Sequence, residues 1–146
     1  MNYNSEIMVS IKPKWCNLIR VHHKQDEIRR SKPPMENMPA KVYVYQTENG
    51  GVIGEFTLSR VVCMQAYIDD CSVKHLTNTF GIRSCVPDEE LFNYIYNNKK
   101  QKLDPDSPYP EAWAWHIDEW REYPRPVPIS EFGLSRPPQS WCYIRR

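Results

Sequence analysis

The sequence predicts a single α+β domain spanning residues 1–146: a small, strongly bent, mixed β-barrel of five or six strands with two or three short helices. Three observations support this fold class. The length suits one compact domain, segments with strand-like alternation outnumber helix-like ones, and the first helix lies between the first two strands. That order fits a bent barrel better than a doubly wound sheet. The 13 prolines against five glycines indicate stiff connections and modest helix content.

The first elements are a short strand over residues 8–11 and a helix that begins at Pro13, since proline is tolerated in a first helical turn. Trp15, Leu18 and Ile19 follow the i, i+3, i+4 spacing of one helix face. The helix is therefore expected to be about two turns long and to bury this apolar face.

A second strand is predicted over residues 24–31. Side chains alternate across a strand, so Glu27 and Arg29 share one face and Ile28 points to the other. We expect Ile28 to face a core while Glu27 and Arg29 face a groove.

A β-hairpin follows. Residues 41–47 alternate cleanly as a strand, and Asn49 and the next glycine supply the positive φ angles that a type I′ turn requires. The return strand over residues 52–67 is long, with a bend predicted at Gly54.

The second half is less regular. Residues 86–98 predict a helix with acidic residues in its first turn, where the helix dipole favours them, and residues 99–111 predict a proline-broken loop. A strand over residues 112–123 and a final strand within residues 136–144 complete the domain. Residues 69–83 show no sustained period and receive no assignment.

Charge is balanced overall but unevenly distributed. The formal net charge of +1 excludes a global field that would draw the chain to nucleic acid, so an anion site has to come from local clustering. The first 32 residues supply such a cluster, with seven basic residues against three acids: Lys12, Lys14, Arg20, Lys24, Arg29, Arg30 and Lys32 against Glu6, Asp26 and Glu27.

Several classes of protein are not expected. No apolar run approaches the roughly 20 residues of a membrane helix, and the first residues are too polar for a secretory signal. The five cysteines form no C-x-x-C pair, and the spacing of Cys71, His75 and Cys85 matches no structural zinc pattern. We expect a soluble cytoplasmic protein with reduced thiols, no membrane partner, no metal and no cofactor.

Several stretches together resemble a known family. "MVSIKPKWCNLI" followed by Lys24-x-x-Glu27-x-Arg29 resembles the G-x-K-x-x-E-x-R signature of ASCH (activating signal cointegrator homology) domains, with His22 at the glycine position. "KVYVYQT" and "GGVIGEFTLSRV" resemble the family's next hairpin. "WHIDEWREYPRPVPISEF" and "RPPQSWCYI" resemble the C-terminal half of short ASCH-like proteins of phages and prophages. The resemblance covers the chain except for roughly residues 66–86 and 98–111.

The resemblance implies a PUA-like barrel with a cleft that takes RNA, DNA or a modified nucleoside. Some ASCH proteins are amidohydrolases that deacylate acetylcytidine with a lysine, a threonine and a glutamate. The lysine corresponds to Lys24, the threonine position is Glu27 here, and Glu55 is a candidate for the glutamate. His22 and Glu27 depart from that pattern, which weakens the transfer of activity more than the transfer of fold.

The candidate catalytic residues are therefore Lys24, Glu27 and Glu55. Nearby like charges would lower the pKa of Lys24 and make it a base or nucleophile, whereas the simpler reading is a solvated lysine at a turn. Glu27 is either a general acid–base or the ion-pair partner of Lys24 or Arg29. The candidate ligand-binding residues combine cations, aromatic rings and hydrogen-bonding groups: Lys12, Lys14, Arg29, His116, Arg136, Ser140 and Trp141.

Three functions remain open. The first is binding of RNA, DNA or a nucleotide in a basic, aromatic cleft. The second is hydrolysis of a modified nucleoside or nucleic acid, by an amidohydrolase or nuclease. The third is binding of a host protein by a phage-encoded chain.

Overall fold

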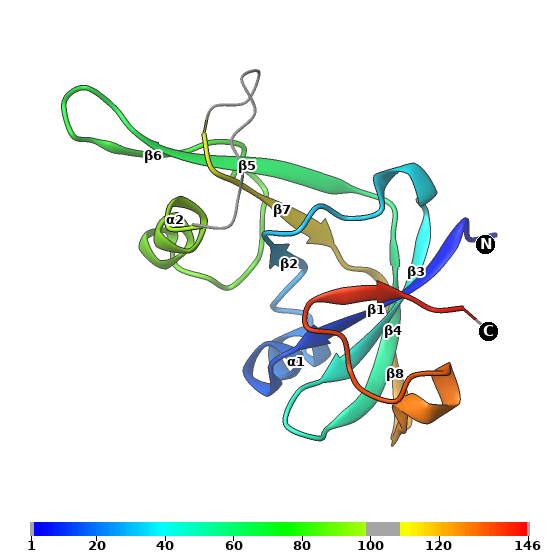
Figure 1. Ribbon diagram of the computed structural model, residues 1–146. Helices are drawn as coiled ribbons and strands as arrows, with labels where there is room; N and C mark the ends of the chain where they lie inside the picture. Colours follow the sequence, from blue (N-terminus) through cyan, green and yellow to red (C-terminus); the bar gives the residue numbers. More distant parts are fainter. Residues whose placement is uncertain (1, 99–108, 146) are drawn as a thin grey trace.

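The computed structural model describes residues 2–98 and 109–145, and these form an α+β architecture of two β-sheets with helices packed against them (Figure 1). The strands are β1 (Ser5–Ile11), β2 (Asp26–Arg29), β3 (Ala40–Gln46), β4 (Gly51–Leu58), β5 (Val61–Ile68), β6 (Lys74–Leu76), β7 (Glu111–His116), β8 (Asp118–Val127) and β9 (Trp141–Tyr143). The helices are α1 (Pro13–Arg20) and α2 (Asp88–Tyr96), and two 3-10 turns are η1 (Met35–Asn37) and η2 (Ile129–Phe132).

One sheet has the order β8-β4-β3-β1-β9, and the other has the order β2-β7-β5-β6. The β1–β3 pair is parallel, and the other pairs are antiparallel. The predicted α+β class is confirmed. The described residues contain nine strands, more than the five or six predicted, and the two sheets do not close into a barrel.

Two of the extra strands arise where long predicted strands pass from one sheet to the other. The predicted strand over residues 52–67 is divided at residues 59–60 into β4 and β5, and the strand over residues 112–123 is divided at Ile117 into β7 and β8. The backbone N–H of His116 donates to the Arg60 carbonyl at 3.0 Å, which ties the two corners together. Strand pairing on both sides of each corner, which no local pattern encodes, decides where the strands break.

An irregularity is present where the bend was predicted, since the pairing of β4 with both neighbouring strands shifts register between Val52 and Gly54. The change from one sheet to the other comes later, at residues 59–60. Gly54 lies inside β4, where a Cβ atom would come within 2.5 Å of the Trp120 ring and 2.6 Å of the Arg121 carbonyl oxygen of β8. This glycine permits close approach of a neighbouring strand.

The β3–β4 hairpin is confirmed, with a difference in its turn. The positive φ angles fall on Glu48 (65°) and Asn49 (61°), one residue earlier than predicted. The alternation of β3 is also confirmed, since Val42 and Val44 enter one core cluster and Tyr43 enters another.

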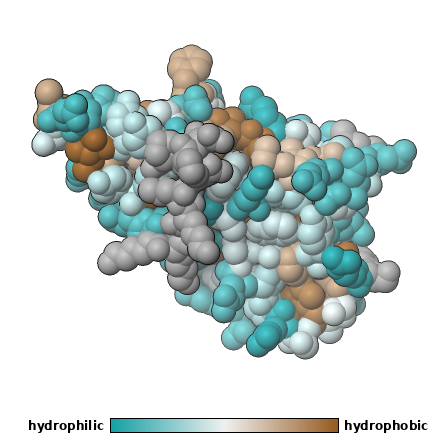
Figure 2. All heavy atoms as spheres, turned by 45° about the horizontal axis from the view of Figure 1, so that its top comes forward, coloured by the Kyte–Doolittle hydropathy of each residue, from teal (hydrophilic) through white to brown (hydrophobic). Residues whose placement is uncertain are grey.

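The core is divided between the two sheets. The larger cluster joins β1, β3 and β4 to α1 and to the tryptophans of β7, with Ile19, Phe56 and Trp115 among its buried residues. A second cluster packs α2 on the other sheet and includes Ile28, as the face assignment of the second strand predicts. On the face that Figure 2 shows, apolar side chains form small patches separated by hydrophilic ones.

The segment without a sequence assignment carries β6, which pairs with β5 in a two-stranded arm that extends beside α2 (Figure 1). The predicted helix over residues 86–98 is confirmed as α2, with three acids in its first turn. The loop predicted over residues 99–111 lies mostly outside the described residues. No helix within residues 2–98 and 109–145 has the length and apolar character needed to cross a membrane.

The predicted first helix is confirmed as α1, and its C-terminus turns the chain into β2. The N–H of His22 donates to the Ile19 carbonyl and the N–H of His23 to the Leu18 carbonyl, each at 3.0 Å. These two bonds form a Schellman motif, whose key residue adopts the left-handed conformation that glycine prefers. His22 holds that position with φ of 63°.

We expect His22→Gly to raise the free energy of unfolding by up to about 1 kcal/mol, because glycine removes the left-handed strain and this gain exceeds its extra entropy when unfolded. Urea denaturation measures the change. His23→Gly is the matched control, because His23 is the exposed neighbour and has no positive φ. This variant should have a free energy of unfolding lower than that of the wild type by about 0.5–1 kcal/mol. A loss of stability in His22→Gly similar to that of the control would contradict this account.

Candidate functional site

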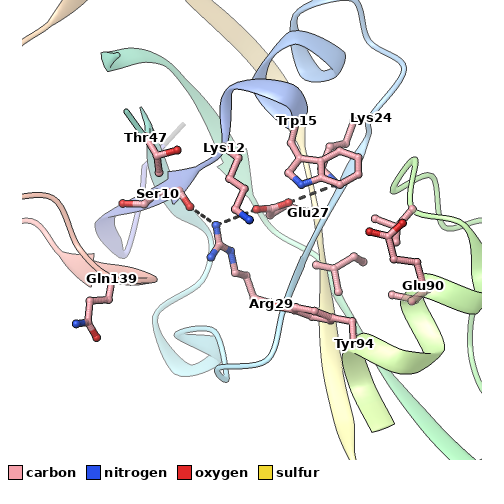
Figure 3. A pocket seen from close by; sticks show the side chains of 13 residues that line it. Ser10, Lys12, Trp15, Lys24, Glu27, Arg29, Thr47, Glu90, Tyr94 and Gln139 are labelled. Carbon is pink, nitrogen blue, oxygen red and sulfur yellow. Dashed lines mark hydrogen bonds and ion pairs between the residues drawn. The ribbon is translucent and has the colours of Figure 1, made fainter. Parts of the chain in front are cut away.

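A pocket of about 330 Å³ lies where α1, β2 and α2 approach one another (Figure 3). It also takes residues from the end of β1, from the β3–β4 turn and from the segment before β9. Its lining residues are Ser10, Lys12, Trp15, Lys24, Glu27, Ile28, Arg29, Thr47, Val86, Glu90, Leu91, Tyr94 and Gln139.

An ion triad forms one wall of this pocket. The Glu27 carboxylate lies 3.4 Å from the Lys24 ammonium and 2.9 Å from the Arg29 guanidinium. The Lys24 and Glu27 side chains are only 1% and 6% exposed, and that of Arg29 is 16% exposed. Buried charges require partners because desolvation is costly, and here one carboxylate serves two cations.

Each of the two cations also donates to a backbone carbonyl group. The Lys24 ammonium donates to the Ser84 carbonyl at 2.7 Å, and the Arg29 guanidinium donates to the Ser10 carbonyl, as Figure 3 shows. The Asp26 carboxylate accepts the Arg83 N–H at 2.9 Å, which fastens the segment that carries Ser84 to β2. The triad is thus held by elements that are distant in sequence.

Burial lowers the pKa of the Lys24 ammonium below its ordinary value. The Glu27 carboxylate opposes this shift by attracting the charged form, and the Arg29 charge adds to it by a smaller amount. The predicted direction is confirmed, but the main cause differs, since the sequence suggested repulsion by neighbouring cations. Arg20, one of those cations, pairs with Glu122 at 2.7 Å instead.

The rim of the pocket is cationic and aromatic. Lys12 is exposed, and its ammonium has no ion-pair or hydrogen-bond partner among residues 2–98 and 109–145. The Trp15 ring has the Lys24 ammonium 4.6 Å from its centroid, and Tyr94 has the Arg30 guanidinium 4.0 Å from its centroid. The arrangement offers an anion a free cation beside two ring walls.

The structure brings together four of the predicted site residues in this pocket, namely Lys12, Lys24, Glu27 and Arg29. Lys14 does not line it and lies instead with its ammonium 4.5 Å from the Trp15 ring centroid. Glu55 lies elsewhere, on β4, where its carboxylate pairs with Lys41 at 3.1 Å and Arg121 at 3.5 Å.

The remaining predicted residues also lie outside the pocket lining. His116 ends β7 with its Nδ1 atom 3.4 Å from the Asp26 carboxylate. Arg136 is exposed before β9, and the Ser140 hydroxyl lies 3.1 Å from that of Ser31. Trp141 lines a separate hollow.

Sequence reasoning missed the far wall of the pocket. Glu90, Leu91 and Tyr94 come from α2, and Thr47 and Gln139 come from two connecting segments. In the sequence, the acidic residues of α2 are explained by their favourable interaction with the helix dipole. No local sequence pattern indicates that this helix lies opposite β2. Only the packing of α2 on the second sheet does so.

The pocket lining supplies nitrogen and oxygen groups. Within residues 2–98 and 109–145, no group of three or more His, Cys, Asp or Glu side chains is placed to hold a metal ion. No cysteine lines the pocket, and burial raises the pKa of Cys16, the buried thiol of α1, to about 12. The reactive groups of the site are an amine, a guanidinium and carboxylates.

The lowered pKa of Lys24 predicts a pH-dependent stability. Between the folded pKa and the unfolded value of about 10.4, the unfolded chain binds more protons, so the free energy of unfolding rises with pH. We expect Lys24→Met, which leaves Glu27 paired with Arg29, to remove this rise. Urea denaturation from pH 7 to pH 10.5 measures it as the difference between wild type and variant.

The free energy of unfolding of the wild type should increase relative to that of Lys24→Met as the pH increases. A difference that stays constant with pH would contradict the lowered pKa of Lys24. Lys14→Met is the matched control for loss of a lysine charge, because Lys14 is exposed and outside the pocket.

Comparisons with known proteins concern the fold. No family model matches the sequence, and no curated protein matches it. The crystal structure of ASCH from Zymomonas mobilis matches with a TM-score of 0.68 and 19% identity, over 98% of this chain and 90% of that chain. A Tyr-to-Phe variant of that protein matches with a TM-score of 0.67 and 18% identity, over 97% of this chain and 91% of that one. A Ser-to-Ala variant matches with a TM-score of 0.68 and 18% identity, over 100% of this chain and 92% of that chain. The likeness spans nearly the whole chain, so the predicted resemblance is confirmed at the level of fold: this chain has the fold of the ASCH protein from Zymomonas mobilis.

Proposed function

We propose that this protein binds a nucleotide, or a nucleotide within a single-stranded nucleic acid, in the pocket between α1, β2 and α2. The observation that carries this proposal is the convergence of Lys12, Lys24 and Arg29 with the rings of Trp15 and Tyr94 in one hollow. Phosphate requires cations and N–H donors, and bases require apolar or aromatic walls.

The cations of the pocket differ in how far they are already paired, and this difference supports the proposal. Lys24 and Arg29 already have a carboxylate and a carbonyl partner each, so they give the pocket a fixed positive wall. The Arg29 Nε–H is buried without a hydrogen-bond partner, whereas the Lys12 ammonium is exposed, has no partner among residues 2–98 and 109–145, and projects beside that wall (Figure 3). We therefore assign the primary phosphate contact to Lys12.

The size of the pocket agrees with a small ligand. Its volume of about 330 Å³ is near the lower end of the range of roughly 300–1,000 Å³ for small-molecule sites. The resemblance to ASCH domains, which implies a cleft for RNA, DNA or a nucleoside, points to the same class of ligand.

Replacement of Lys12 tests the proposal. We expect Lys12→Ala to weaken binding of a cytidine-containing single-stranded RNA by about tenfold, because one charge-assisted contact is lost. The log–log slope of affinity against salt should become shallower by about 0.7–1. Isothermal titration calorimetry at several salt concentrations measures both values.

Lys14→Ala is the matched control, since it removes an equal charge two residues away from a side chain outside the pocket. Equal losses in both variants would indicate a diffuse charge effect. Absence of binding at low salt to RNA, DNA and mononucleotides would overturn the proposal, and a partner protein captured independently of Lys12, Lys24 and Arg29 would replace it.

A second candidate function, hydrolysis of an acylated nucleoside, is favoured by one observation: the lowered pKa of Lys24 beside the Glu27 carboxylate. A neutral amine can take a proton from water as the water adds to the acyl carbon. The protonated amine returns that proton to the departing nitrogen as the acyl carbon–nitrogen bond breaks, so the products are a free amino group and a carboxylic acid, and the amine is neutral again.

For this activity we expect acetylcytidine to be converted to cytidine and acetate at a rate that rises with pH as Lys24 loses its proton. Chromatography of the products measures the rate, and Lys24→Met should abolish it while Lys14→Met leaves it unchanged. Equal product formation by wild type and Lys24→Met would show that Lys24 does not perform this chemistry.

A further inference from the structure

We propose that a second hollow, beside the main pocket, binds the base of the neighbouring nucleotide, so that the ligand is a strand of at least two nucleotides. This inference rests on the proposed function. The second hollow has a volume of about 260 Å³, and its walls include Lys32, Met35, Asn37, Trp141 and Tyr143.

The two hollows are adjacent. The hydroxyl groups of Ser31 and Ser140 lie 3.1 Å apart and bridge the segment after β2 to the segment before β9. Ser31 lies between Arg29, which lines the main pocket, and Lys32, which lines the second hollow. Ser140 likewise lies between Gln139 of the main pocket and Trp141 of the second hollow.

The two hollows are separated by a short stretch of chain. Consecutive Cα atoms are about 3.8 Å apart, so Arg29 and Lys32, which line different hollows, have Cα atoms at most about 11 Å apart. A strand whose first base occupies the main pocket would cross the Ser31–Ser140 contact to reach the second hollow. The two hydroxyl groups share one hydrogen bond, which leaves one O–H free to donate to a phosphate oxygen.

The walls of the second hollow suit a base. The Trp141 and Tyr143 rings lie 5.3 Å apart at 79°, which makes an aromatic corner. Asn37 donates to the Tyr143 hydroxyl at 2.9 Å, and Trp141 packs edge-on against the buried Trp115 at 6.2 Å. The corner is therefore held in place before a ligand arrives, which lowers the entropic cost of stacking.

The charge of the second hollow favours a phosphate less than that of the main pocket does. Lys32 and Glu36 both line it, so their charges offset each other. The main pocket, in contrast, has three cations against Glu27 and Glu90. A strand would place its phosphate on the Lys12 side of the Ser31–Ser140 contact and a neutral base in the aromatic corner.

The test compares the affinities of a mononucleotide, cytidine monophosphate, and a dinucleotide, cytidylyl-cytidine carrying a terminal phosphate, by isothermal titration calorimetry. We expect the wild type to bind the dinucleotide about 5-fold to 150-fold more tightly, the range that one stacked base supplies. Trp141→Leu should remove this gain and leave the mononucleotide affinity unchanged. Trp120→Leu, which replaces another half-buried tryptophan that lines neither hollow, should keep the gain.

Photocrosslinking provides a measurement that does not depend on the folding of a variant. A dinucleotide with 5-iodouridine at one position, then at the other, should label Trp141 or Tyr143 from one position only, as mapped by mass spectrometry of peptides.

The outcomes separate the two proposals. If neither ligand binds, the proposed function fails, and this inference fails with it. If the mononucleotide binds but the dinucleotide gains nothing, or if no label reaches Trp141 or Tyr143 from either position, the second subsite is wrong and the proposed function stands.

Discussion

The Glu27 carboxylate, buried between the Lys24 ammonium and the Arg29 guanidinium, is the interaction on which the site depends. Two buried cations without a carboxylate between them would be strongly unfavourable. Their second partners, the carbonyl groups of Ser84 and Ser10, come from the segment before α2 and from β1. Parts of the chain that the triad connects therefore surround the pocket, and the same contacts that satisfy the charges also shape the wall.

This arrangement separates fixed from available charge. Lys24 and Arg29 create a positive potential in a region of low dielectric, where a nearby anion is attracted more strongly than at the surface. Lys12 remains free to contact a ligand directly. For a reaction at Lys24, the ammonium would first have to lose its proton and its contact with the Ser84 carbonyl. Binding is therefore our first proposal, and the lowered pKa of Lys24 is the reason that hydrolysis is the second.

Local sequence patterns were sufficient to predict the elements whose own residues show a helix or strand period. The apolar spacing and Pro13 predicted α1, the alternation predicted β3, and the lysine, glutamate and arginine around β2 identified the main cationic wall. His22 is an example at a single residue. The ASCH signature has glycine at this position, which indicates a positive φ, and His22 does adopt a positive φ in the structure. Glu55 shows the opposite, because a glutamate on a strand has many available partners, and here Lys41 and Arg121 of adjacent strands are the ones it meets.

By itself the sequence determined the α+β class, the order of its first elements and the grouping of Lys12, Lys24, Glu27 and Arg29, because these features depend on periodicity and on residues close together along the chain. Only the tertiary structure decided where the long strands turn between sheets, that α2 supplies the far wall of the pocket, and that Trp141 belongs to a neighbouring hollow. Those features arise from strand pairing and burial between segments that are distant in the sequence. Because these tertiary interactions override local propensity, no single stretch of the sequence predicts them.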